Sequence, residues 1–250
     1  MIRIYFKSAK DNNTKIITEF KAGSWLRIES PDDEEILQLE EKYKLSHGLI
    51  KDALDPNEVP RLEIDEGIVY VYTRVPYMDN EHVMTFPIMI AVNSNFIATV
   101  SSKDFSFFEK FISGKIDYST TQKAKLLIQI FSEINEVYKV FTNKISKKNR
   151  EMANKLEHIT NDDIVEFVRF EEILNDFVAS LTATNTVLKN LLHNKVIEFY
   201  ESDRDLVEDM FLSNGQLIKS NTGNLRNIKN IREAYSAIMT QDLNRTIKIL

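Results

Sequence analysis

The stretch TTQKAKLLIQIFSEINEVYKVFTNKISKKNREMANKLEHI, residues 120–159, decides the architecture of this chain. Its apolar side chains recur at alternating steps of four and three residues. They are Leu127, Phe131, Ile134, Tyr138, Phe141, Ile145, Met152 and Ile159, with Lys148 in one position of the same series. Such a repeat places the apolar side chains along one seam of a long α-helix, as in a coiled coil.

Two further helices are expected after this stretch. Residues 160–163 (TNDD) can cap a return helix, and residues 202–205 (SDRD) can start a third segment that runs unbroken to Leu250 over ~72 Å at about 1.5 Å per residue. The seam of the return helix includes Phe170, Leu174, Phe177, Leu181 and Leu188. Proline is excluded from helix interiors, and the 5 prolines of the chain all precede residue 88. The sequence therefore offers no proline break after that point.

The middle of the last segment is unusually polar. Asn214, Asn221 and Asn224 fall in its seam positions, with Gly215 and Gly223 beside them, and both residue types are poor helix formers. One interpretation is a break in the helix at residues 221–224. We favour a continuous helix whose polar seam is hydrated and faces a water-filled axis.

Residues 1–117 have a different character, with short β-forming runs between turn and helix-capping signals. The expected strands are residues 2–6, 15–20, 25–29, 61–64, 67–75, 83–92 and 96–101, with a hairpin turn at 93–95. Helices are expected from Ser30 and Pro31 to about residue 43, from Ser46 to residue 54, and after Asp104.

The predicted fold is therefore of the α+β or α/β class: an N-terminal mixed sheet flanked by helices, then a hairpin of long helices and a long C-terminal stalk helix. We place the α/β domain at residues 1–117 and the helical stalk at 118–250. Within the stalk, the hairpin is expected at 120–200 and the terminal helix at 202–250.

Composition excludes several classes of function. The net charge is -6, which argues against broad nucleic-acid binding, and the one basic cluster, residues 144–150, is best read as a solvated helix face. The chain has no cysteine, so disulfides and thiolate metal sites are excluded. The N-terminus lacks the apolar run of a signal peptide and no stretch of 18 apolar residues occurs, which favours a cytoplasmic chain.

Signals for an enzyme are weak. The 4 histidines, His47, His82, His158 and His193, do not form a metal-binding pair, and no phosphate-binding glycine loop or nucleophile motif occurs. Trp25 and the set Phe105, Phe108 and Phe111 are expected in the core rather than on a ligand platform. The acidic doublets at 162–163 and 171–172 are expected to be solvated. We predict no enzymatic activity.

Several motifs occur in an order typical of one family. A strand containing Trp25 precedes an acidic helix; residues 49–54 (LIKDAL) and 60–63 (PRLE) follow, then the strand 68–72, the helical hairpin and the terminal run NRTIKIL, residues 244–250. In this order the chain resembles the cytoplasmic part of a CorA-type magnesium transporter. The resemblance covers essentially the whole chain and implies that it stops just before the first membrane helix, so that contact with the membrane is made through a missing C-terminal segment.

The resemblance also implies a regulatory metal site. In that family, an acid on the short helix of one subunit and an acid near the start of the long helix of its neighbour bind Mg²⁺, and Asp52 and Asp209 stand at the matching positions. Lys51 stands where a second acid would help, and Leu212 replaces an acid found in some relatives, which argues against a second cation. Lys51 is expected to neutralise Asp52 partly or to form a salt bridge that replaces the metal. Co²⁺, Ni²⁺ and Zn²⁺ are alternatives to Mg²⁺.

At the far end, the resemblance implies a pore entrance in a homopentamer. Asn244 matches a ring of amides, Ile247 and Leu250 match apolar rings that gate by dewetting, and Glu233 can form an acidic ring that attracts hydrated cations. Without the resemblance, the same residues read as the seam of a soluble oligomer. Two functions thus stay open at this point: the regulatory domain of a magnesium or related zinc transporter, and a soluble coiled-coil scaffold or interaction protein.

Overall fold

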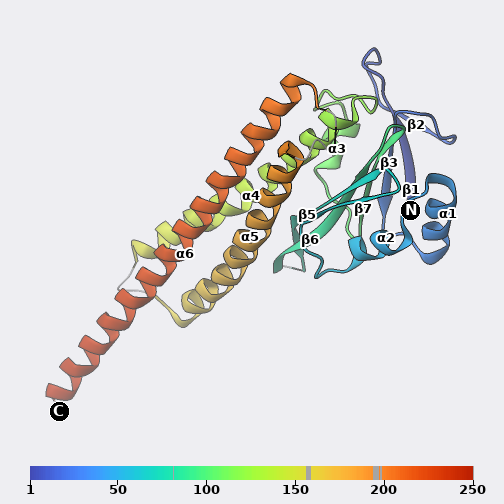
Figure 1. Ribbon diagram of the computed structural model, residues 1–250. Coiled ribbons are helices and arrows are strands. Elements are labelled where there is room, and N and C mark those ends of the chain that lie inside the picture. Colours follow the sequence, from blue (N-terminus) through green and yellow to red (C-terminus); the bar gives the residue numbers. More distant parts are fainter. Residues whose placement is uncertain (81, 156–158, 194–196, 198, 250) are drawn as a thin grey trace.

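The chain forms a mixed sheet between two layers of helices, and three long helices extend from one of these layers (Figure 1). The computed structural model describes residues 1–80, 82–155, 159–193, 197 and 199–249. The strands are β1 (Ile2–Phe6), β2 (Lys15–Ile17), β3 (Ser24–Glu29), β4 (Leu62–Asp65), β5 (Ile68–Asp79), β6 (His82–Val92) and β7 (Phe96–Ser101). The helices are α1 (Asp33–Tyr43), α2 (His47–Leu54), α3 (Phe108–Ile112), α4 (Lys123–Ala153), α5 (Asn161–His193) and α6 (Glu201–Ile249).

The sheet has the strand order β2-β1-β3-β7-β6-β5-β4. Only the central pair β3 and β7 is parallel, and the other neighbours are antiparallel. The predicted turn between β6 and β7 is confirmed, since the Asn93 side chain accepts hydrogen bonds from the backbone N–H groups of Asn95 and Phe96. β7 is buried along its whole length, as expected for a strand covered on both faces.

Alternation along the strands divides the core into two apolar clusters. Leu26, Tyr70 and Tyr72 point to the face covered by α1 and α2. Trp25 and Val71 point to the other face, where the core continues into α3, α4, α5 and α6. The predicted burial of Trp25 and of the phenylalanines at 105, 108 and 111 is confirmed.

Two helices begin later than the sequence predicts. The N-cap of α1 is Asp32, whose side chain accepts from the Glu35 N–H in a capping box, whereas Ser30 lies outside the helix with φ 40. α3 begins at Phe108 rather than after Asp104, because the Asp104 carboxylate binds Arg27 Nη2 at 2.6 Å instead of capping a helix. α2 begins after Ser46 as predicted, but without a side-chain cap.

The three long helices form the predicted hairpin and terminal helix, and the fold class is confirmed. Thr160 and Asp163 exchange side-chain to backbone hydrogen bonds at the start of α5, as expected of a cap. α6 is one continuous 49-residue helix, so the alternative of a break at 221–224 is wrong. It packs along both α5 and α4 and then continues beyond them (Figure 1). The division into domains at residue 117 stays a prediction.

The interpretation of the polar seam in α6 as facing a water-filled axis is wrong. Asn214, Asn221 and Asn224 are buried inside the bundle of this chain. Asn214 Nδ2 donates to the Leu181 carbonyl of α5 at 2.7 Å. The Thr142 hydroxyl of α4 donates to Asn221 Oδ1 at 2.9 Å. The Asn224 amide exchanges hydrogen bonds with the hydroxyl of Ser146, which also lies in α4. Polar partners on the neighbouring helices compensate part of the burial, while Asn214 Oδ1 and Asn221 Nδ2 have no hydrogen bond within the described residues. These partners cannot be identified from the periodicity of α6 alone.

One asparagine in this region lacks such partners. Asn149 of α4 is 3 % exposed, and in the described part of the chain neither Oδ1 nor Nδ2 has a hydrogen bond. It lies one turn from the buried Ile145 and Met152. Because an unpaired buried amide costs about 1–3 kcal/mol, we expect Asn149→Leu to raise the free energy of unfolding by about 1–2 kcal/mol in urea titrations.

The matched control for this prediction is Asn224→Leu, which removes a buried amide whose Oδ1 and Nδ2 are both bonded to Ser146 and is expected to give no such gain. A lower unfolding midpoint for Asn149→Leu than for the wild type would show that its amide is satisfied by solvent.

Candidate functional site

Asp52 lies in the last turn of α2. Ile50 and Ala53 of the same helix are buried against the sheet, which turns Asp52 toward the surface, where its side chain is 45 % exposed. Its Oδ2 accepts a hydrogen bond from Arg61 Nη2 at 2.7 Å. The expectation that Lys51 neutralises Asp52 is wrong in this structure, because the Lys51 ammonium pairs with Asp33 of α1 at 3.1 Å.

Arg61 is shared among three carboxylates. Besides Asp52, its Nε donates to Glu63 Oε1 at 2.5 Å, and its Nη1 pairs with Glu58. Burial of the guanidinium lowers the pKa of Arg61, but the hydrogen bonds to Glu58 and Glu63 outweigh that effect and raise it above its ordinary value. The acids come from α2, from the loop after it and from β4. One guanidinium thus joins three separate segments of the chain.

The ring of Tyr72 supports this guanidinium from below. The Arg61 Cζ atom lies 4.1 Å from the ring centroid, a cation–π geometry, and Tyr72 itself is fully buried. The Tyr72 hydroxyl donates to the Leu49 carbonyl at 2.7 Å, and burial raises the pKa of this hydroxyl far above its usual range. The Tyr72 ring beneath Arg61 is therefore held in place by burial and by this hydrogen bond, and its hydroxyl stays uncharged.

Asp209 lies near the start of α6. Val207 and Met210 are buried against the bundle, so Asp209 is on the opposite, exposed side of the helix. Leu212, one turn later, is a large apolar side chain that is 60 % exposed. The two predicted metal ligands are not brought together within one chain, because Asp52 lies on the α2 side of the sheet and Asp209 on the side of the helical bundle.

Within the described residues, no group of three or more His, Cys, Asp or Glu side chains is placed to hold a metal ion. Because Asp52 and Asp209 lie on opposite sides of the sheet, a site that used both would need two copies of the chain.

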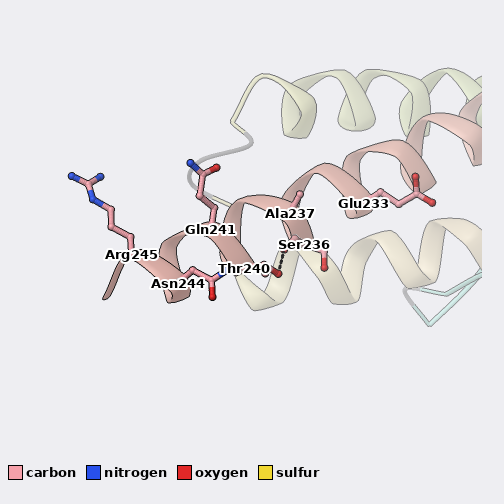
Figure 2. A pocket seen from close by; sticks show the side chains of 7 residues that line it. All are labelled: Glu233, Ser236, Ala237, Thr240, Gln241, Asn244 and Arg245. Carbon is pink, nitrogen blue, oxygen red and sulfur yellow. Dashed lines mark hydrogen bonds between the residues drawn. The ribbon is translucent and has the colours of Figure 1, made fainter. Parts of the chain in front are cut away.

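The far end of α6 carries a row of small and polar side chains. Figure 2 shows Glu233, Ser236, Ala237, Thr240, Gln241, Asn244 and Arg245, which line a shallow depression on this part of the helix. Glu233 and Asn244 are exposed, and Glu233 makes only a loose pair with Lys229, at 3.8 Å. The side chain of Ile247 and the whole of Leu250 lie outside the described residues, so their predicted roles stay predictions.

No helix in the described part of the chain has both the length and the apolar character required to cross a bilayer.

Arg61 is the residue at this site that sequence reasoning missed. Its motif, Pro60 to Glu63, is visible in the sequence, but the motif does not reveal a contact with an acid 9 residues earlier. That contact depends on how the loop between α2 and β4 folds back and places Arg61 over the ring of Tyr72, which belongs to β5.

Comparisons with known proteins agree on the fold. A cobalt/magnesium transport protein CorA of Methanocaldococcus jannaschii is 25% identical over 232 residues, which cover 90% of this chain and 73% of that protein. The structure of the soluble domain of CorA from the same organism matches with a TM-score of 0.85 at 21% identity, covering 95% of this chain and 97% of that one. The ZntB cytoplasmic domain from Vibrio parahaemolyticus matches with a TM-score of 0.75 at 10% identity, covering 96% and 98%, and so shares the fold.

A family model described as CorA-like Mg²⁺ transporter protein matches residues 20–250, and its description is that of a transporter family rather than of an enzyme family. Since this match covers nearly the whole chain, the protein belongs to the CorA-like family of Mg²⁺ transporter proteins.

Proposed function

We propose that this chain is the cytoplasmic regulatory and pore-funnel domain of a CorA-type divalent cation transporter at the inner membrane. The observation that carries the proposal is the family match over residues 20–250, combined with an unbroken α6 that continues beyond the bundle. The transporter is proposed to be a homopentamer in which the α6 helices surround the ion path.

The proposed regulatory site holds Mg²⁺ between Asp52 of one subunit and Asp209 of its neighbour. The two carboxylates lie on opposite sides of the sheet and are both accessible, as an inter-subunit site requires. Mg²⁺ is a hard cation that keeps much of its water and uses one or two carboxylates, so binding is expected to be weak. Carboxylate and water oxygens are ligands that suit Mg²⁺, and the name of the relative adds Co²⁺ as a second candidate.

The proposed pore-facing residues lie along the far end of α6. Glu233 would form an acidic ring, Asn244 a ring of amides, and Ile247 and Leu250 apolar constrictions that keep the closed pore dry. The exposure of Glu233 and Asn244 in the single chain supports this, because pore-lining side chains are free until the helices assemble.

Thermal melts test the regulatory site. In the assembled protein, at a Mg²⁺ concentration ten times the dissociation constant, binding to the folded state adds about 1.4 kcal/mol per site and raises the melting temperature by roughly 3–6 °C. Asp52→Ala and Asp209→Ala are each expected to abolish this shift. The matched control, Asp162→Ala, removes an exposed acid at the start of α5 and should leave it intact.

Equal shifts in the wild type and in both site variants would refute the proposed site. Repeating the melts with CoCl₂, NiCl₂ and ZnCl₂ ranks the cations. A shift with Zn²⁺ that both site variants abolish, together with no shift with Mg²⁺, would favour a zinc transporter.

A further inference from the structure

Asp52 already has a cationic partner within its own subunit. One of its two carboxylate oxygens is bound to Arg61 at 2.7 Å, so a divalent cation that approaches Asp52 meets a bound guanidinium rather than a free acid. A full positive charge at that distance repels a second cation and lowers its affinity for the same carboxylate.

We propose that Arg61 is a built-in counter-ion that competes with the divalent cation for Asp52, so that cation binding is an exchange of partners. This inference rests on the proposed role of Asp52 and adds the residue that sets its affinity. In the cation-free state Arg61 neutralises Asp52. In the cation-bound state Arg61 withdraws to its other two carboxylates.

The surroundings of Arg61 allow such an exchange. Glu63 holds Nε and Glu58 holds Nη1, so the guanidinium keeps two charged partners when Nη2 leaves Asp52. The Tyr72 ring supports the same guanidinium and does not depend on Asp52. Withdrawal therefore leaves no buried unpaired charge, which is the usual reason that broken ion pairs are costly.

The charge balance favours the exchange as well. Three carboxylates and one guanidinium carry an excess of two negative charges, and the proposed ligand Asp209 of the neighbouring subunit adds a third, so a divalent cation would cancel most of the excess. Lys51 is adjacent to Asp52 in the sequence but pairs with Asp33, so it is no direct competitor. The effects of the Arg61 and Lys51 charges on divalent-cation binding can therefore be compared in one experiment.

Titration of MgCl₂ into the assembled protein after chelator treatment, followed by isothermal titration calorimetry, gives the half-saturating Mg²⁺ concentration and tests the exchange. For Arg61→Gln the half-saturating Mg²⁺ concentration is expected to fall roughly threefold to tenfold. The factor is no larger because solvent screens the charges of this partly exposed pair. Lys51→Gln also removes one positive charge close to Asp52, but Lys51 makes no contact with that carboxylate because it pairs with Asp33. This substitution is expected to shift the half-saturating concentration by less than about twofold.

The possible outcomes separate this inference from the proposed function. A midpoint for Arg61→Gln equal to that of the wild type, or an equal fall in both variants, would overturn the exchange while leaving Asp52 as a ligand. If Asp52→Ala keeps the wild-type Mg²⁺ response, the proposed site itself fails.

Should Arg61→Gln unfold, Arg61→Lys carries the test, because a lysine ammonium keeps the charge but lacks the planar fork that reaches three acids at once. It is expected to lower the midpoint by a smaller factor, and a midpoint at or above the wild-type value would count against the exchange.

Discussion

A transporter that carries Asp209→Asn is expected to lose most of its inhibition by internal magnesium, with the half-inhibiting concentration rising roughly tenfold. Asp209 is exposed and borders two residues that pack into the bundle, Val207 and Met210, which the substitution leaves in place. The change therefore removes a charge without disturbing α6. A bound ion shifts a conformational equilibrium only as far as it prefers one state, so removing the proposed ligand Asp209 is expected to weaken closure.

The control for this substitution is Asp205→Asn, an exposed acid one turn earlier on the same helix, for which unchanged inhibition is expected. Flux into vesicles or cells over a range of internal Mg²⁺ concentrations gives the comparison. Wild-type inhibition in the Asp209→Asn transporter would exclude this residue from regulation, and a similar loss in both variants would indicate a general field effect.

The largest loss of stability is expected for Trp25→Ala, at about 3–5 kcal/mol. Trp25 is fully buried in β3 and packs against the rings of Tyr5, Phe108 and Tyr118 at centroid distances of 5.1, 5.3 and 6.2 Å. Its Nε1 donates to the Thr99 hydroxyl at 3.0 Å. The alanine variant leaves a cavity where the sheet meets α3. Urea unfolding monitored by circular dichroism measures the loss.

Trp25→Phe separates packing from hydrogen bonding in this core. It keeps an aromatic ring and loses the bond to Thr99, so a smaller cost of about 1–2 kcal/mol is expected. Tyr200→Ala, at a side chain that is 78% exposed, should change stability by less than about 0.5 kcal/mol. A loss for Trp25→Ala no larger than that of Tyr200→Ala would mean that this cluster is not part of the cooperative core.

The helices and strands of this chain were predictable because their signals are local. The four-and-three spacing of apolar residues in α4 and the β-forming runs of β5, β6 and β7 do not depend on distant neighbours. The start of α3 was misplaced because Asp104 resembles a helix cap in the sequence, whereas in the fold its carboxylate binds Arg27, 77 residues away. Long-range competition for one side chain has no local signature.

The candidate site was predictable only in part, for a related reason. Asp52 and Asp209 could be singled out by resemblance, but neither their separation by the sheet nor the contact of Asp52 with Arg61 follows from spacing. The polar positions of α6 were recognised at Asn214, Asn221 and Asn224, and their environment was misjudged. An amide in a seam looks the same in a sequence whether water or a neighbouring helix satisfies it.

The length of α6 has a mechanical consequence. The helix packs on the bundle as far as Tyr235, so the free arm from Tyr235 to Ile249 measures ~21 Å at about 1.5 Å per residue. A tilt of ~5° about Tyr235 would displace side chains one turn away by only about half an ångström, and the far end by roughly 2 Å. The tip thus magnifies the rotation about fourfold relative to the first turn after the pivot. A stiff rod held along most of its length converts a small adjustment in packing into a larger displacement at its free end.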